Sequence, residues 1–191
     1  MNPGGFCSVF PKRKIFCRQR IVTEYRDLEQ NPILNIAACV GLPNPNNIYE
    51  WRCTISGPAD TPFGGGLFYL KILFPKDYPN HKPEVCFLTP IYHINVNPKA
   101  GLNEPLGHVC ISTLNWWTPQ CTIRQVLTDI FALFWLSNPE SPYGLERAKE
   151  MNTNINLYNA KCKYYTQKYA AMNNDVPNIT TDWNFSDNVT C

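Results

Sequence analysis

The sequence lacks the features of membrane-spanning, nucleic-acid-binding and zinc-binding proteins. It contains no uncharged apolar run of about 18 residues, the length from which a membrane-spanning helix is read. Its net charge of +2 is too small to indicate nucleic-acid binding by itself. There is no Cys-x-x-Cys pair, and the three histidines form no Cys/His ligand set. We therefore expect no metal, no nucleic acid and no membrane span.

A disulfide framework and a secretion signal are also missing. The 9 cysteines are an odd number spread over the whole chain, without the even, clustered spacing of small secreted domains. Pro11 and the basic residues 12–14 interrupt what would be the apolar core of a signal peptide. We expect a protein of a reducing compartment, the cytoplasm, the nucleus or both.

What is present is typical of one globular, loop-rich domain. The 191 residues are 44% hydrophobic and 17% charged, with 17 prolines and 10 glycines. Residues 1–19 carry basic but no acidic side chains and are predicted to be a mobile arm. Residues 20–172 should form the domain, and residues 173–191 an acidic C-terminal tail.

Hydrophobic periodicity predicts an α+β fold. Apolar residues at helical spacing predict a helix over Arg20–Asn31, and alternating apolar residues predict strands at 49–55 and 68–74. A last short strand is expected around 84–88, after a Pro-rich bend. A Thr-x-x-Gln capping box at Thr122 opens a deeply buried helix that stops at Asn138-Pro139. Shorter and longer helices follow near 145–151 and 154–171. This order favours an antiparallel sheet with helices on one face and at the ends.

The stretch from Thr89 to Pro119 has no sustained period, and irregular stretches of this length are usually functional. It contains Cys110, with Asn95 and His93 upstream. Taken singly, each has an ordinary structural interpretation: a buried free thiol, a turn-forming asparagine and a hydrogen-bonded histidine. From the spacing alone the case for catalysis is weak.

The ordered motifs from about Arg20 to Ala170 resemble those of the ubiquitin-conjugating enzymes. The matching segments are Ile55-Ser-Gly-Pro-Ala-Asp-Thr-Pro-Phe-Gly-Gly-Gly66, Phe74-Pro-Lys-Asp-Tyr-Pro79, Tyr92-His-Ile-Asn95, Val109-Cys-Ile-Ser112, Trp117-Thr-Pro119, Asn138-Pro-Glu-Ser-Pro142 and Thr166-Gln-Lys-Tyr-Ala170. The resemblance implies the family's fold, a four-stranded antiparallel sheet with an N-terminal helix and C-terminal helices.

The resemblance also implies an acyl-transfer site. Cys110 would take ubiquitin as a thioester, which is activated toward amines. Asn95 matches the asparagine of the family's His-Pro-Asn motif and would donate to the oxyanion formed when a lysine attacks. His93, preceded by Tyr92, would hold the loop by hydrogen bonds. Ser141 lies where the family commonly carries an acid or serine near the acceptor lysine.

Several further assignments follow from the family pattern. Glu140, beside Ser141, would act only indirectly. Arg20, Asn80, Pro119 and Gln120 would contact the activating enzyme or a ligase. The implied partners are ubiquitin or a ubiquitin-like protein, an activating enzyme, a ligase and a substrate lysine. No cofactor is expected on this chain, because ATP is used by the activating enzyme.

The sequence departs from the family at two places in the site. Ile94 replaces the motif's proline, and the segment from Asn95 to Cys110 is several residues longer than in typical members, including Pro98 to Pro105. Longer loops cost little free energy, about 0.6 kcal/mol per doubling, but the insertion could shift Asn95 relative to the thiol.

Three alternatives remain. The first is the same chemistry on a ubiquitin-like modifier such as Nedd8. The second is a poorly active ubiquitin-binding variant of the fold; non-catalytic variants lack the cysteine, so Cys110 argues against it. The third is a thiol hydrolase that uses Cys110 with His108 or His93, which is disfavoured because no orienting third group stands at recognisable spacing.

Overall fold

The structure is a computed structural model that describes residues 10–33, 38–42, 44, 46–99, 105–139 and 142–171. The tail, and the first nine residues of the arm, lie outside the described residues. No helix among the described residues is long and apolar enough to cross a membrane.

The first helix, α1 (Phe10–Gln30), starts ten residues before the predicted position at Arg20. The helix therefore takes in residues 10–19 of the predicted arm, and the predicted start of the helix was wrong. The residues after Pro11 are helix-compatible, and a proline in the first turn removes no intrahelical hydrogen bond. Cys17 extends the buried stripe of Ile21 and Leu28 by one turn, with 1% of its surface exposed.

Four antiparallel strands form one sheet in the order β1 (Ala38–Gly41), β2 (Glu50–Ser56), β3 (Leu67–Leu73) and β4 (Glu84–Phe87). This confirms the four-stranded sheet implied by the resemblance and the three strands predicted from the residues. The four-residue β1 is too short to show a period, and it was not predicted from the residues.

Alternation along β2 and β3 places one face of the sheet in the core. Trp51, Cys53 and Ile55 are buried on β2, as are Phe68, Leu70 and Ile72 on β3. The hairpin between these strands needs two glycines. A side chain at Gly57 would meet the Phe63 carbonyl oxygen at 1.9 Å, and Gly65 has a φ of +77°.

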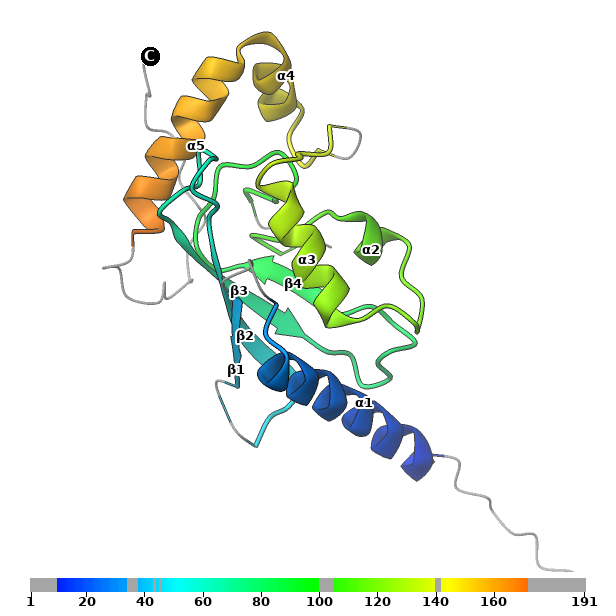
Figure 1. Cartoon of the computed structure of the whole chain (residues 1–191). Coiled ribbons are helices and arrows are strands. Elements are labelled where there is room, and N and C mark those ends of the chain that lie inside the picture. Colours follow the sequence, from blue (N-terminus) through cyan, green and yellow to red (C-terminus); the bar gives the residue numbers. More distant parts are fainter. Residues whose placement is uncertain are drawn as a thin grey trace, which may run out of the picture.

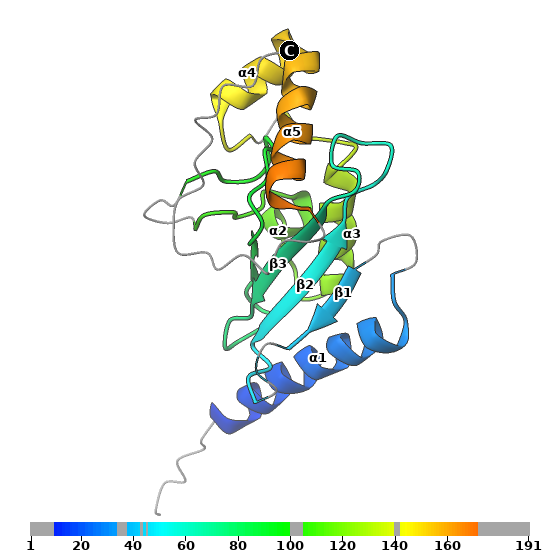
Figure 2. The ribbon, with the colours of Figure 1, turned by 90° about the vertical axis from the view of Figure 1, so that its left-hand side faces the viewer.

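Four helices follow the sheet: α2 (Ser112–Asn115), α3 (Ile123–Leu133), α4 (Leu145–Thr153) and α5 (Ile155–Tyr169). Thr122 and Gln125 form the predicted capping box. The helix ends at Leu133, five residues before the predicted stop. Figures 1 and 2 show α3 against one face of the sheet, α1 at one end of the molecule and α4 and α5 at the other. The predicted α+β architecture is confirmed.

Candidate active site

A short hairpin beside β4 brings Asn95 next to Cys110. Val96 and Val109 form an antiparallel bridge, and the Asn97 N–H donates to the His108 carbonyl oxygen at 2.9 Å. The Cys110 N–H donates to the Asn95 carbonyl oxygen, also at 2.9 Å. The two main chains therefore stay adjacent although the segment between them is longer than in typical family members, and residues 100–104 of that segment lie outside the described residues.

Cys110 is partly exposed and lies in a groove of ≈ 230 Å³. The groove is lined by Cys110, Ile111, Ser112, Asp129, Ala132, Leu133, Leu136 and Asn138. The Asn115 side-chain amide donates to the Cys110 sulfur, with Nδ2 and Sγ 3.4 Å apart. An accessible thiol in a groove can receive an acyl group from another protein.

The other described cysteines are poorer nucleophiles or lie elsewhere. Cys17, Cys53, Cys86 and Cys162 are buried, and burial raises the pKa of the Cys86 and Cys162 thiols to about 12. Such thiols are almost wholly protonated at neutral pH and cannot react as thiolates. Cys121 is partly exposed, but it does not line the groove of Cys110.

His93 is a buried structural residue. Its Nδ1 accepts a hydrogen bond from the Asn95 N–H at 3.0 Å, so Nε2 carries the proton and donates to the Leu133 carbonyl oxygen at 3.0 Å. Burial lowers the pKa of His93 to about 4. The ring is therefore neutral at physiological pH and joins the Asn95 loop to the end of α3.

This burial predicts a loss of stability in mild acid. Between pH 6.5 and 4 the unfolded chain binds a proton on His93 and the folded chain does not, so stability falls as the pH is lowered. The free energy of unfolding, measured by denaturant titration, should fall by about 2 kcal/mol more in the wild type than in His93→Gln between pH 6.5 and 4.5.

Thr89→Val supplies the control for this experiment. Thr89 is also fully buried but carries no ionisable group, so this variant should keep the pH dependence of the wild type. Equal pH slopes in the wild type and His93→Gln would show that the His93 ring is not held neutral by the fold.

The Asn95 side chain is fully buried and engaged with the loop after α3. Its Nδ2 donates to the Asn138 carbonyl oxygen at 2.7 Å, and its Oδ1 accepts from the Asn138 N–H at 2.8 Å. Its exposed fraction is 0%. These contacts make Asn95 a clamp between the hairpin and the loop that borders the groove.

Ile94, which replaces the motif's proline, makes two main-chain hydrogen bonds. Its N–H donates to the Tyr158 hydroxyl at 3.2 Å, and its carbonyl oxygen accepts from the Tyr143 N–H at 2.7 Å. A proline at position 94 would have no N–H. The Ile94 N–H is therefore an additional buried donor, and the Tyr158 hydroxyl accepts its hydrogen bond.

A double-mutant cycle should therefore reveal coupling between positions 94 and 158. Tyr158→Phe leaves the Ile94 N–H unsatisfied, and Ile94→Pro removes that donor. The two variants together should be about 1 kcal/mol more stable to denaturant than the sum of the single changes predicts. Tyr164→Phe, a more exposed tyrosine of α5, should combine additively with Ile94→Pro. Additivity at Tyr158 would contradict this pairing.

Tyr92 lies away from the thiol, between the hairpin and the C-terminal helices. Its hydroxyl donates to the Glu150 carboxylate at 2.7 Å, and the Arg147 guanidinium lies 4.4 Å from the ring centre. Arg147 also donates to the His93 carbonyl oxygen at 3.3 Å. Tyr92 and Arg147 thus have a structural role: they connect the His93 segment to the C-terminal helices.

The remaining residues of the predicted site are described only in part. Ser141 and Glu140 lie outside the described residues. His108 contacts the Tyr143 hydroxyl through Nδ1, and no histidine of the described segments hydrogen-bonds to the Cys110 sulfur. The cysteine–histidine pair of a thiol hydrolase is thus absent from this part of the chain. Within the same segments no group of three or more His, Cys, Asp or Glu residues could hold a metal ion.

Comparison with known proteins decides the family. The family model described as "Ubiquitin-conjugating enzyme" matches residues 20–166. The chain belongs to the ubiquitin-conjugating enzyme family. Among solved structures, the E2 domain of a ubiquitin conjugating enzyme from Toxoplasma gondii is 32% identical, with a TM-score of 0.68, over 80% of this chain and 98% of that one.

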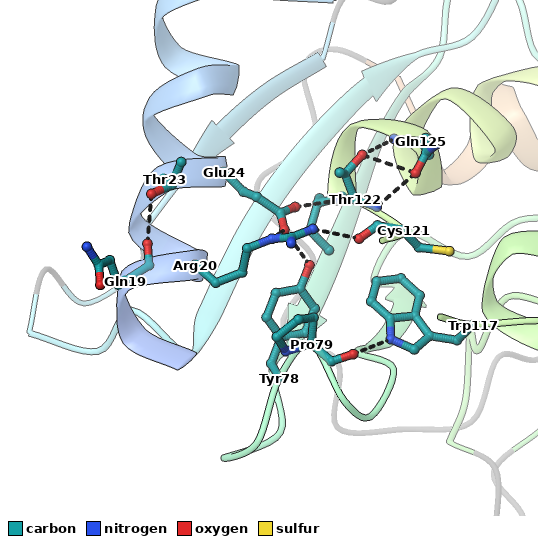
Figure 3. Close-up of polar contacts among 11 residues, drawn as sticks. Gln19, Arg20, Thr23, Glu24, Tyr78, Pro79, Trp117, Cys121, Thr122 and Gln125 are labelled. Atoms are coloured by element: carbon teal, nitrogen blue, oxygen red, sulfur yellow. Dashed lines mark hydrogen bonds and ion pairs between the residues drawn. The ribbon is translucent and has the colours of Figure 1, made fainter. Parts of the chain in front are cut away.

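Arg20, assigned above to partner contacts, links α1 to the bend before α3 in this family member. Its guanidinium pairs with Glu24 and donates to the Cys121 carbonyl oxygen at 2.9 Å (Figure 3). Glu24 is 7% exposed and accepts from the Tyr78 hydroxyl and the Ile123 N–H, both at 2.7 Å. Arg20 therefore has a structural partner on each side, and its side chain is 25% exposed.

The two bends expected to face partners lie side by side and are exposed. The Trp117 indole N–H donates to the Pro79 carbonyl oxygen at 2.7 Å, which joins the bends (Figure 3). Asn80 on one bend and Pro119 and Gln120 on the other are exposed. The two bends are thus linked by this hydrogen bond, and the three side chains remain accessible.

Asn115 and Tyr158 could not be identified from the sequence. Asn115 stands five residues after Cys110, at the end of a four-residue helix whose period cannot be read. Tyr158 lies 64 positions from its partner Ile94. The only signal for it was the missing proline, which leaves one main-chain donor to be satisfied.

Proposed function

We propose that this chain is an active ubiquitin-conjugating enzyme that carries ubiquitin as a thioester on Cys110. The observation that carries the proposal is the position of the thiol: Cys110 is partly exposed, lines the groove, and is held against Asn95 by a main-chain hydrogen bond. Non-catalytic variants of the fold lack such a thiol. Family membership supplies the reaction class.

In the first half-reaction, the Cys110 sulfur attacks the carbonyl carbon of the thioester held by the activating enzyme. A bond forms between Cys110 Sγ and the acyl carbon, and the activating enzyme's thiolate leaves. One thioester replaces another, so the exchange needs no cofactor on this chain. ATP is used earlier, by the activating enzyme.

In the second half-reaction, a substrate lysine attacks the Cys110 thioester, usually with a ligase bound. The amine, with a reference pKa of about 10.4, must lose a proton before it can attack. The loop after α3 borders this reaction, because Asn138 lines the groove beside Cys110. Ser141 and Glu140 follow in the same loop and are the candidates for influence on the amine.

We further place the protein in the cytoplasm, the nucleus or both. The described cysteines at 17, 53, 86, 110, 121 and 162 are free thiols, which suits a reducing compartment. The proposed nucleophile must also stay reduced to accept an acyl group.

Separate charging reactions with two modifiers test the proposal. The protein is incubated with ATP and either ubiquitin and its activating enzyme or Nedd8 and its activating enzyme, and each charged product is chased with free lysine. We expect charging by ubiquitin and discharge to lysine. Charging by Nedd8 alone would assign the enzyme to that modifier, and charging by neither would contradict the proposed activity.

A further inference from the structure

A side-chain hydrogen bond to the sulfur of the proposed nucleophile comes from a residue outside the family motif. Asn115 is exposed, and its Nδ2 donates to the Cys110 sulfur at 3.4 Å. Hydrogen bonds to sulfur are longer than those to oxygen, because the sulfur atom is larger. Among the described residues, this amide faces the atom at which acyl transfer would occur.

The main chain around Asn115 is fixed, so the Cα that carries the amide keeps its position beside Cys110. The main-chain N–H of Asn115 donates to the Ile111 carbonyl oxygen at 3.0 Å. Leu114, the preceding residue, is 1% exposed and anchors α2 in the core. Thr113 hydrogen-bonds to Asp129 on α3, which joins the two helices. Only the side-chain torsions of Asn115 then need to adjust when charge develops on the sulfur.

The amide of the motif asparagine is directed elsewhere. Asn95 is fully buried, and both polar atoms of its side chain are bonded to the main chain of Asn138. Asn115 thus directs its side-chain amide at the Cys110 sulfur, whereas Asn95 directs its amide at the loop after α3.

We propose that Asn115 is a catalytic residue whose side-chain amide stabilises negative charge on the Cys110 sulfur. The proposal rests on the proposed thioester function. When a lysine attacks the thioester, a nitrogen–carbon bond forms and the carbon–sulfur bond breaks. The electron pair stays on Cys110 Sγ, and the amine proton passes to solvent. The side-chain N–H of Asn115 donates a hydrogen bond to the sulfur as this charge forms.

The size of the effect differs between the two half-reactions. Hydrogen bonds to charged groups are about twice as strong as neutral ones, so loss of the donor should slow discharge by about tenfold. Charging should slow less, by about threefold. There the thiolate is the attacking group, and a less stabilised thiolate is also more nucleophilic.

Two substitutions of Asn115 and one matched control test this role. Asn115→Ala removes the donor. Asn115→Asp keeps the shape but replaces the donor with an acceptor of negative charge, which should slow discharge by more than tenfold. Asn156→Ala removes an exposed amide from α5 and should behave as the wild type in every measurement. Thermal midpoints of all variants show whether the fold is intact.

The experiment has one readout that needs ubiquitin and one that does not. Single-turnover discharge of the charged protein to free lysine measures the catalytic effect. Alkylation by iodoacetamide at neutral pH, followed by mass spectrometry of the separate cysteine peptides, measures the reactivity of the free thiol. Cys110 should react about threefold more slowly in Asn115→Ala than in the wild type, whereas Cys121 in the same sample should be unchanged.

The outcomes separate the two proposals. If the wild type cannot be charged, the proposed function fails and the alkylation rate alone judges Asn115. If the wild type is charged but both Asn115 variants discharge and alkylate at its rates, the role of Asn115 is overturned and the thioester function stands. Slower alkylation of Cys110, with Cys121 unchanged, supports the hydrogen bond to sulfur.

Discussion

Cys110→Ala is expected to abolish the reductant-sensitive ubiquitin adduct, with a loss of at least about 10³-fold in charging. The reason is chemical: alanine has no nucleophile, and no other described cysteine lines the groove. Cys110→Ser should give either no adduct or an ester that resists reductant. The adducts can be measured by electrophoresis under non-reducing and reducing conditions after ATP-dependent charging.

Cys121→Ala is the matched control, because Cys121 is also partly exposed but lies on the bend before α3. It should charge as the wild type does. Both variants should unfold near the wild-type temperature. A normal, reductant-sensitive adduct on Cys110→Ser would remove Cys110 from the mechanism.

Asn95→Ala is expected to weaken charging and discharge together, each by about tenfold, and to lower the free energy of unfolding by about 2 kcal/mol. The substitution leaves the Asn138 N–H and carbonyl oxygen without their partner and loosens the loop that borders the groove. Cys110 is bonded to the main chain of residue 95, so it should move with the hairpin.

The two half-reactions distinguish this clamp from the oxyanion role that the family resemblance implies. An oxyanion donor would slow discharge by about 10²-fold, with charging much less affected and stability unchanged. That result would contradict the clamp. Asn97→Ala is the control: this amide is also buried in the hairpin, but it binds the Pro105 carbonyl oxygen at the tip. It should lower stability with little effect on either half-reaction.

The regular parts of the fold could be predicted from local sequence patterns. Alternation along β2 and β3 and the capping box at Thr122 are short-range signals with a direct physical cause, and each was found in the structure. The start of α1 was not predicted correctly, because the basic residues before Arg20 suggested a solvated arm. The packing of Cys17 against the Pro75 region, which supports the earlier turns, is a contact across 58 positions.

The candidate site, like the fold, could be predicted only in part from the sequence. Cys110 and the motif residues His93 and Asn95 could be located from a family resemblance, which carries information about chemistry that spacing does not. Their partners could not, because the Asn138 main chain and the Tyr158 hydroxyl reach the site only through the tertiary fold. The effect of the insertion was also open until the hairpin pairing was known.

The most direct test of the account is ATP-dependent charging of the wild-type protein with ubiquitin and its activating enzyme, analysed with and without reductant. The account predicts one adduct that requires ATP, is present without reductant and disappears when reductant is added, as a thioester on Cys110 must. No adduct, or an adduct that survives reductant, would contradict the claim that this chain carries ubiquitin through Cys110.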